Sequence, residues 1–191
     1  MDAATATEQE PERGHQYAMG VDWGRQNDFT VFSIIDILEK RQVYLDRFTS
    51  IDYEIQTSRL RNIYKRYNPV VSMVEYNAMG GPIIERLNAE GLNLTPFITT
   101  NKTKEPLIRG LESAFDNGDI TILNDPTQVA ELQAYEQEQL TTYWKFGAPA
   151  GLHDDTVIAL ALAWLAITDK PPSWDSIADL GNIGEFRSRW S

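Results

Sequence analysis

The chain has 191 residues, of which 42% are hydrophobic and 24% are charged, as in a single globular domain with a sizeable core. It contains no cysteine and only two histidines, which excludes disulfides, thiol catalysis and zinc fingers and disfavours a histidine-rich zinc site. The formal charge of −11 argues against strong intrinsic affinity for nucleic acid, because nucleic-acid-binding domains are usually basic over at least one face.

The two ends of the chain differ in composition from its centre. Residues 1–16 are small and acidic and predict a flexible leader or interdomain linker, followed by one domain over 17–170. Pro171 and Pro172 end that domain, and 171–191 form a C-terminal tail. The start has no signal-peptide pattern, and the longest apolar run is too short to cross a bilayer, so we expect no membrane association.

The first half of the domain predicts an antiparallel meander followed by a helix and a central strand. Apolar and β-branched residues indicate three consecutive strands, at 17–22, 30–38 and 42–48. An amphipathic pattern predicts a helix over 53–67, which Asn68 and Pro69 end. The continuous apolar run at 70–75 is typical of a strand covered on both faces.

The second half predicts further helices and strands. A helix is expected over about 82–90, and a strand over 94–98 that Pro96 restricts to an edge or a strand end. The remaining elements are a helix from a Thr103 cap to about Asn117, an extended segment at 119–123, a helix from Asp125 to about Gln139, a strand at 140–146 and a helix over about 153–168. This order predicts an α/β fold, a mixed sheet with helices on both faces.

Acidic residues stand at the ends of strongly apolar segments. Asp22 and Glu75 each end a predicted buried strand, and Asp154 and Asp155 open the last apolar helix. Carboxylates beside buried segments are costly unless a partner compensates them. If the fold gathers these side chains, they form an oxygen-lined site suited to Mg²⁺ or Mn²⁺.

Each acid also has an ordinary structural explanation. Asp22 could be a turn residue beside Gly24, and Asp28 could either return to the same sheet edge or cap the turn. One of Asp154 and Asp155 is expected to cap the helix while the other faces the sheet, and the sequence does not distinguish them. Glu75 has no basic residue nearby in sequence, so any partner is distant.

Basic residues near these segments are candidates for DNA phosphate contacts. Lys102, Lys104 and Arg109 belong to the start of one predicted helix, and Arg25 and Lys145 flank the acid-bearing loops. The alternative for each is an ordinary solvated surface residue. The basic face within 59–66 is expected to be solvated surface.

Four motifs together resemble one known family. They are Gly-Val-Asp-Trp-Gly with Asp28 following, Val-Glu-Tyr-Asn around Glu75, Asn-Lys-Thr-Lys at 101–104, and His-Asp-Asp-Thr-Val-Ile-Ala-Leu-Ala from His153. In this order they are similar to the nuclease domain of the large terminase subunit of tailed bacteriophages. The resemblance covers about 17–168 and implies an RNase H-like (RuvC-like) fold.

The resemblance implies a metal-dependent endonuclease that cuts concatemeric double-stranded phage DNA by two-metal hydrolysis during packaging. Asp22, Glu75 and one or both of Asp154 and Asp155 would hold the ions, with Asp28 near the second. It also implies a packaging ATPase domain elsewhere in a longer chain, since no Gly-X₄-Gly-Lys-[Ser/Thr] motif occurs here. A small terminase subunit and a portal would be partners, in the host cell cytoplasm.

Three rival interpretations remain at this level. A Holliday-junction resolvase or transposase of the same fold would share the acids but should be more basic and dimeric. A phosphate-binding ATPase of the actin or sugar-kinase type needs a second domain and a second glycine-rich loop. In a catalytically inactive interaction domain, the acids would be caps and turns.

Overall fold

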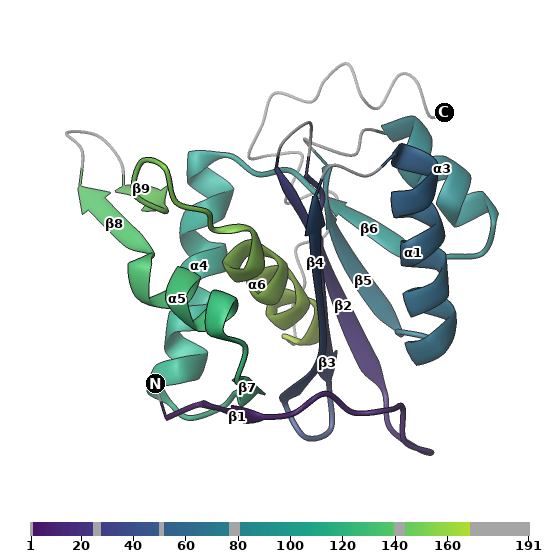
Figure 1. Ribbon diagram of the computed structural model, residues 1–191, viewed down its shortest axis with the longest axis horizontal. Coiled ribbons are helices and arrows are strands. Elements are labelled where there is room, and N and C mark those ends of the chain that lie inside the picture. Colours follow the sequence, from purple (N-terminus) through teal and green to yellow (C-terminus); the bar gives the residue numbers. More distant parts are fainter. Residues whose placement is uncertain (1, 25–27, 50–51, 77–80, 140–143, 169–191) are drawn as a thin grey trace.

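The computed structural model describes residues 2–24, 28–49, 52–76, 81–139 and 144–168. A five-stranded mixed sheet in the order β4-β3-β2-β5-β6 forms its centre (Figure 1). The first three strands in sequence pair antiparallel, and β2, β5 and β6 pair parallel. The strands are β2 (Tyr17–Asp22), β3 (Phe29–Asp36), β4 (Arg41–Thr49), β5 (Val71–Glu75) and β6 (Leu94–Phe97). The predicted meander is confirmed, and the strand with Pro96 lies at an edge.

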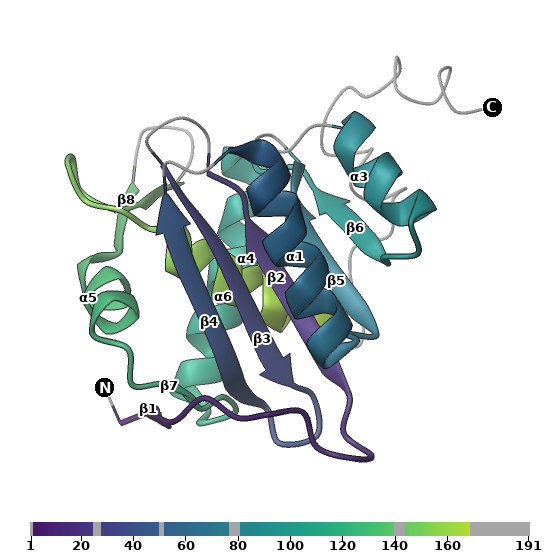
Figure 2. The same cartoon turned by 45° about the vertical axis from the view of Figure 1, so that its right-hand side comes forward.

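Helices cover both faces of this sheet, as predicted (Figure 2). One face carries α1 (Tyr53–Tyr67) and α3 (Gly81–Ala89), and the other carries α4 (Asn101–Asp116), α5 (Pro126–Ala134) and α6 (Asp155–Ile167). Each face has its own buried apolar cluster, so the sheet separates two cores. None of the described helices is long and apolar enough to cross a membrane.

Helix α6 lies directly against β2 because Gly20 has no side chain. A Cβ atom at Gly20 would stand 2.0 Å from the Ala159 carbonyl oxygen and 2.4 Å from the Ala163 backbone nitrogen. Alanines on the helix and a glycine on the strand therefore allow the two backbones to approach each other closely. This contact fixes where α6 lies along the sheet.

Helix α4 begins earlier than the sequence predicts. Thr100 is its cap: the Thr103 N–H donates to the Thr100 hydroxyl at 3.2 Å, and the Thr100 N–H donates to the Thr103 hydroxyl at 2.8 Å. The predicted cap at Thr103 is therefore wrong, and Thr103 is the third helical residue of a capping box. Pro106 lies inside the helix, beyond the first turn where proline is expected.

Helix α5 is shorter than predicted. It ends at Ala134 instead of near Gln139, and the following residues form β8 (Glu136–Gln139), which pairs antiparallel with β9 (Trp144–Gly147). All four residues of β8 are exposed and polar, so the strand has no apolar alternation to reveal it in the sequence. The predicted strand at 140–146 is found as β9, and 140–143 lie outside the described residues.

The start of the chain is attached to the domain, in contrast to the expected flexible leader. Strand β1 (Ala4–Ala6) pairs parallel with β7 (Ile122–Leu123), and the Tyr67 hydroxyl donates to the Gln9 carbonyl at 2.7 Å. Ala6 is buried, which gives this short strand an apolar contact with the domain. An interdomain linker at 1–16 and a domain spanning 17–170 stay predictions, and 171–191 lie outside the described residues.

His15 gives the attachment of the N-terminal segment a pH dependence. Its Nδ1 lies 2.5 Å from Asp36 Oδ2, and this hydrogen bond raises the pKa of His15 above 6.5. A raised pKa means that the ion pair contributes fully below the unfolded value and is lost as the pH rises through the folded value. We expect His15→Ala to lower the free energy of unfolding more at about pH 5.5 than at about pH 9. Urea unfolding at both pH values measures this, and equal losses would contradict it.

Candidate metal centre

Asp22 and Glu75 lie side by side at the ends of adjacent parallel strands. Val21 of β2 pairs with Val74 of β5, and each acid is the next residue of its strand. Side chains alternate between the faces of a strand, so Asp22 lies on the face of Gly20, which contacts α6. Glu75 follows the same rule, because Met73 packs in the core on the α6 face. Both carboxylates are therefore directed to the α6 face.

The N-terminus of α6 lies at this same end of the sheet. Ala159 contacts Gly20, and Asp155 precedes Ala159 by about one helical turn, roughly 6 Å along the axis. Asp22 follows Gly20 by two strand residues, roughly 7 Å. The charges of Asp155 and Asp154 act on Asp22, so the helix runs antiparallel to β2 and its first residues lie near Asp22.

The electrostatics of Asp22 confirm this convergence. Its pKa is raised well above 3.8, first by burial, then by the charge of Glu75 and a side-chain hydrogen bond with it, and further by the charges of Asp155 and Asp154. Two carboxyl groups in hydrogen-bond contact must share a proton or a cation. The structure therefore places Asp22 against Glu75 and within electrostatic range of Asp154 and Asp155.

Asp155 is the better placed of the two helix-opening acids for a ligand role. Burial, followed by the charge of Glu131, raises its pKa to about 6, while His153 and Arg47 act in the opposite direction. Its Oδ2 atom is buried and has no hydrogen bond within the described part of the chain. The nearest basic side chains are His153, with Nδ1 at 3.3 Å, and Arg47, with Nη2 at 4.0 Å.

Asp154 occupies the N-cap position of α6 without making a side-chain capping bond. Its Oδ2 instead accepts from Lys104 Nζ at 3.0 Å. The expected division, with one aspartate capping and the other facing the sheet, is not found. The cap comes from Glu131 of α5, a residue that sequence patterns did not select.

The donor set suits a hard divalent cation, since it consists of carboxylate oxygens. Among the described residues, no three acidic or histidine side chains are gathered closely enough to hold one ion as they stand. The carboxylates pair instead with one another, with Lys104 and with His153. A bound cation would replace these pairings.

The other predicted site residues take different positions. Asp28 is exposed and is not among the groups that shift the pKa of Asp22, so the described contacts do not join it to the cluster. Lys104 lies at the cluster, whereas Lys102 and Lys145 are exposed. Arg25 lies outside the described residues.

Arg109 is engaged within the domain. Its Nε lies 3.1 Å from Glu105 Oε1, and its guanidinium is 5.7 Å from the ring centre of Trp144 and 5.5 Å from that of Phe146. It therefore joins α4 to β9, and phosphate binding by Arg109 would compete with these contacts.

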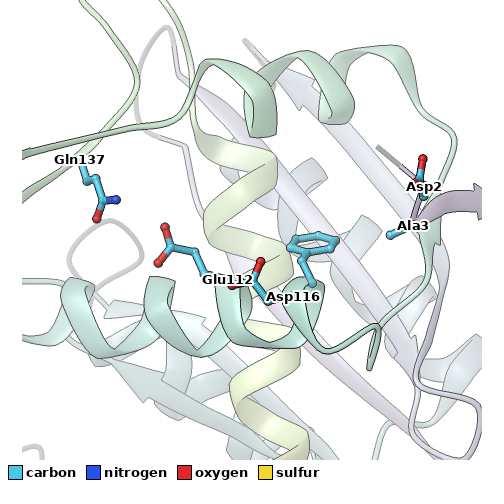
Figure 3. Close-up of a pocket in the computed structure, with 6 residues that line it drawn as sticks. Asp2, Ala3, Glu112, Asp116 and Gln137 are labelled. Carbon is cyan, nitrogen blue, oxygen red and sulfur yellow. The ribbon is translucent and has the colours of Figure 1, made fainter.

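A separate hollow of about 540 Å³ lies on the outer side of α4 (Figure 3). Its lining is acidic and contains none of the predicted site residues; it consists of Asp2, Ala3, Glu112, Phe115, Asp116 and Gln137. The candidate centre is thus the group of acids at the carboxyl ends of β2 and β5, and the hollow is a distinct surface feature.

Comparison with known proteins gives a consistent family match. The family model described as "Terminase RNaseH-like domain" matches residues 19–166. The "Terminase, large subunit" of Thermus virus P23-45 and that of Thermus phage G20c are each 30% identical over 152 residues, or 78% of this chain. The chain spans 31% of the length of these relatives.

Solved structures show the same similarity. The large terminase nuclease from thermophilic phage G20c matches with a TM-score of 0.75 and 28% identity, over 82% of this chain and 84% of that one. The same nuclease with bound magnesium matches equally well. The HK97 bacteriophage large terminase, at 15% identity and a TM-score of 0.63, shares the fold over 82% of this chain and 40% of its own.

Proposed function

Because this chain belongs to the Terminase RNaseH-like domain family, we propose that it is a metal-dependent endonuclease domain that cleaves double-stranded phage DNA during packaging. One observation supports the proposal: Asp22 and Glu75 end adjacent parallel strands, and the charges of Asp154 and Asp155 at the start of α6 act on Asp22. These acids come from three separate elements, so simple turn or cap roles do not account for their convergence. Cleavage of concatemeric DNA is the form of the reaction that a packaging role requires.

The acids of the cluster would hold two Mg²⁺ or Mn²⁺ ions. Bound in this way, the ions supply an activated water and stabilise the leaving 3′ oxygen. The carboxylates of Asp22 and Glu75 orient the site from the rigid sheet, and Asp155 completes it from the helix. Lys104 forms an ion pair with Asp154 and therefore lies beside the acidic residues of the site. There its ammonium group can bind a DNA phosphate.

The net charge of −11 fits a domain that receives DNA from a partner rather than capturing it alone. We propose that the packaging ATPase domain of a longer chain, the small terminase subunit and the portal provide that delivery in the host cell cytoplasm. The large terminase relatives, of which this chain spans 31%, support this assignment. Lys102 and Lys145, both exposed, are proposed phosphate contacts together with Arg25.

Plasmid cleavage tests the function directly. We expect the purified chain to convert supercoiled plasmid to nicked and linear forms with Mn²⁺ or Mg²⁺, and EDTA to abolish this conversion because the ions hold the reacting groups. Agarose gels read the products. Activity that survives EDTA would exclude the metal mechanism, and exclusive cutting of four-way junctions would favour the resolvase alternative.

A further inference from the structure

The start of α6 is capped by a residue from another helix. Glu131 of α5 is 6% exposed, and its Oε2 accepts from the Thr156 backbone N–H at 2.9 Å and from the Thr156 hydroxyl at 2.5 Å. The first backbone N–H groups of a helix have no partner within the helix and need an external acceptor. An aspartate at the cap normally supplies it, and here Asp154 does not.

The second oxygen of Glu131 holds the capping side chain in place. Arg47 Nη2 lies 3.1 Å from Glu131 Oε1, and the Arg47 guanidinium lies 3.2 Å from the ring centre of Phe29. The Phe29 ring in turn meets the His153 ring edge to face, with centres 4.9 Å apart. Residues of β3, β4 and α5 therefore surround the first turn of α6. Arg47 is the cationic partner that a buried carboxylate needs.

We infer that Glu131 is a positioning residue of the metal centre: it caps α6 from outside, so that neither Asp154 nor Asp155 has to accept the first helix N–H groups and both carboxylates can exchange their present partners for cations. This inference rests on the proposed function. An aspartate that accepted the helix N–H groups would direct an oxygen toward its own backbone and away from a ligand. Because Glu131 accepts these N–H groups, the aspartates do not have to. Its negative charge also interacts favourably with the positive end of the helix dipole.

The buried face of α5 supports a role beyond packing. Its buried residues are Gln128 and Glu131, both polar, whereas a helix that serves only the core would place apolar residues there. Gln128 exchanges hydrogen bonds with Gln42 of β4, each at 2.8 Å. This pairing fixes α5 on the sheet at one turn from Glu131 and so fixes the cap.

The test compares three variants for Mn²⁺ binding by titration calorimetry and electron paramagnetic resonance. Glu131→Ala is expected to weaken Mn²⁺ affinity by about 10- to 100-fold, the usual cost of losing a group that orients metal ligands. Glu131→Gln keeps an acceptor oxygen for Thr156 and is expected to restore most of that affinity. Glu90→Ala is the matched control, because it also breaks a glutamate–arginine pair, with Arg61 Nε at 2.6 Å, but just after α3 on the other face of the sheet.

Amide hydrogen exchange at Thr156, measured in EDTA, tests the cap without any metal. Glu131→Ala is expected to speed this exchange, and Glu90→Ala to leave it unchanged. Should the alanine variant fail to fold, Thr156→Val removes only the hydroxyl donor and is expected to weaken Mn²⁺ binding by a smaller factor.

Equal Mn²⁺ affinity in Glu131→Ala and Glu90→Ala, or unchanged affinity in Thr156→Val, would overturn the positioning role. A glutamine variant as weak as the alanine variant would also overturn it, because the cap would then not explain the loss. Wild-type protein that binds no Mn²⁺ would instead overturn the proposed function, and Thr156 exchange would still decide whether Glu131 caps the helix.

Discussion

Replacing Asp22 by asparagine is expected to slow metal-dependent plasmid cleavage by at least about a hundredfold, more than the loss of a group that merely orients a ligand. Asp22 is buried against Glu75 and is influenced by the charges of Asp154 and Asp155, so asparagine removes the negative charge and one of the two carboxylate oxygens at this position. Initial rates of plasmid nicking with Mn²⁺ measure the effect. Asp119→Asn is the matched control, because Asp119 is paired with Lys40 beside the β3–β4 turn, at the other end of the sheet.

The same variant should keep its fold. The pKa of Asp22 is raised in the folded chain, so its ionisation costs stability as the pH rises above the unfolded value. Asparagine removes that cost, and in EDTA near neutral pH Asp22→Asn is expected to melt at or above the wild-type temperature. Added Mn²⁺ should then raise the melting temperature of the wild type more than that of the variant. Cleavage by Asp22→Asn within a few-fold of wild type would contradict the metal site.

Replacing Gly20 by alanine is expected to lower the free energy of unfolding by about 3 kcal/mol or more, at the upper end of overpacking effects. The added Cβ would meet backbone atoms of Ala159 and Ala163 at 2.0 and 2.4 Å, and backbone cannot rotate away as a side chain can. Helix α6 would have to move as a unit, carrying Asp155 away from Asp22. Urea unfolding measures the stability, and Mn²⁺ titration measures the accompanying loss of metal affinity.

Gly110→Ala provides the control for that substitution. Gly110 lies in α4, and a Cβ there would meet no atom within 4 Å. Because alanine favours helix over glycine, this variant is expected to gain up to about 1 kcal/mol. The same chemical change should therefore act in opposite directions at the two glycines. Equal changes in the free energy of unfolding for the two variants would contradict the close contact between α6 and Gly20.

Local patterns were sufficient to predict most of the fold. The β-branched runs predicted the meander, the amphipathic pattern predicted α1 from Tyr53 to Tyr67, and Pro96 predicted an edge strand. These signals come from residues close together in the sequence, and hydrophobic periodicity reports on such local structure. The position of Asp22 and Glu75 at the ends of buried strands was predictable in the same way, whereas the sequence left open that these two strands pair with each other.

Contacts between distant residues were not predictable in this way. Glu131 reaches Thr156 across 25 positions, and its partner Arg47 lies still farther away in sequence. As a result, the sequence assigned the cap of α6 to the adjacent aspartates, the usual arrangement. A possible signal was the polar character of Gln128 and Glu131 one turn apart, on what became the inner face of α5. Strand β8 was missed because its sequence has no strand pattern, and only its pairing with β9 makes it a strand.

The strict alternation of faces along β2 has a consequence for how this domain can change in evolution. Asp22 and Trp23 are neighbours with opposite surroundings, one beside α6 and the other in the core beneath α1. Loss or gain of a single residue within Tyr17–Asp22 would exchange them, placing an indole among the acids and a carboxylate in the apolar core. Length changes should therefore be purged from this strand even where substitutions are accepted. They should accumulate in exposed connections that join no pair of hydrogen-bonded strands, such as 117–118 between α4 and β7.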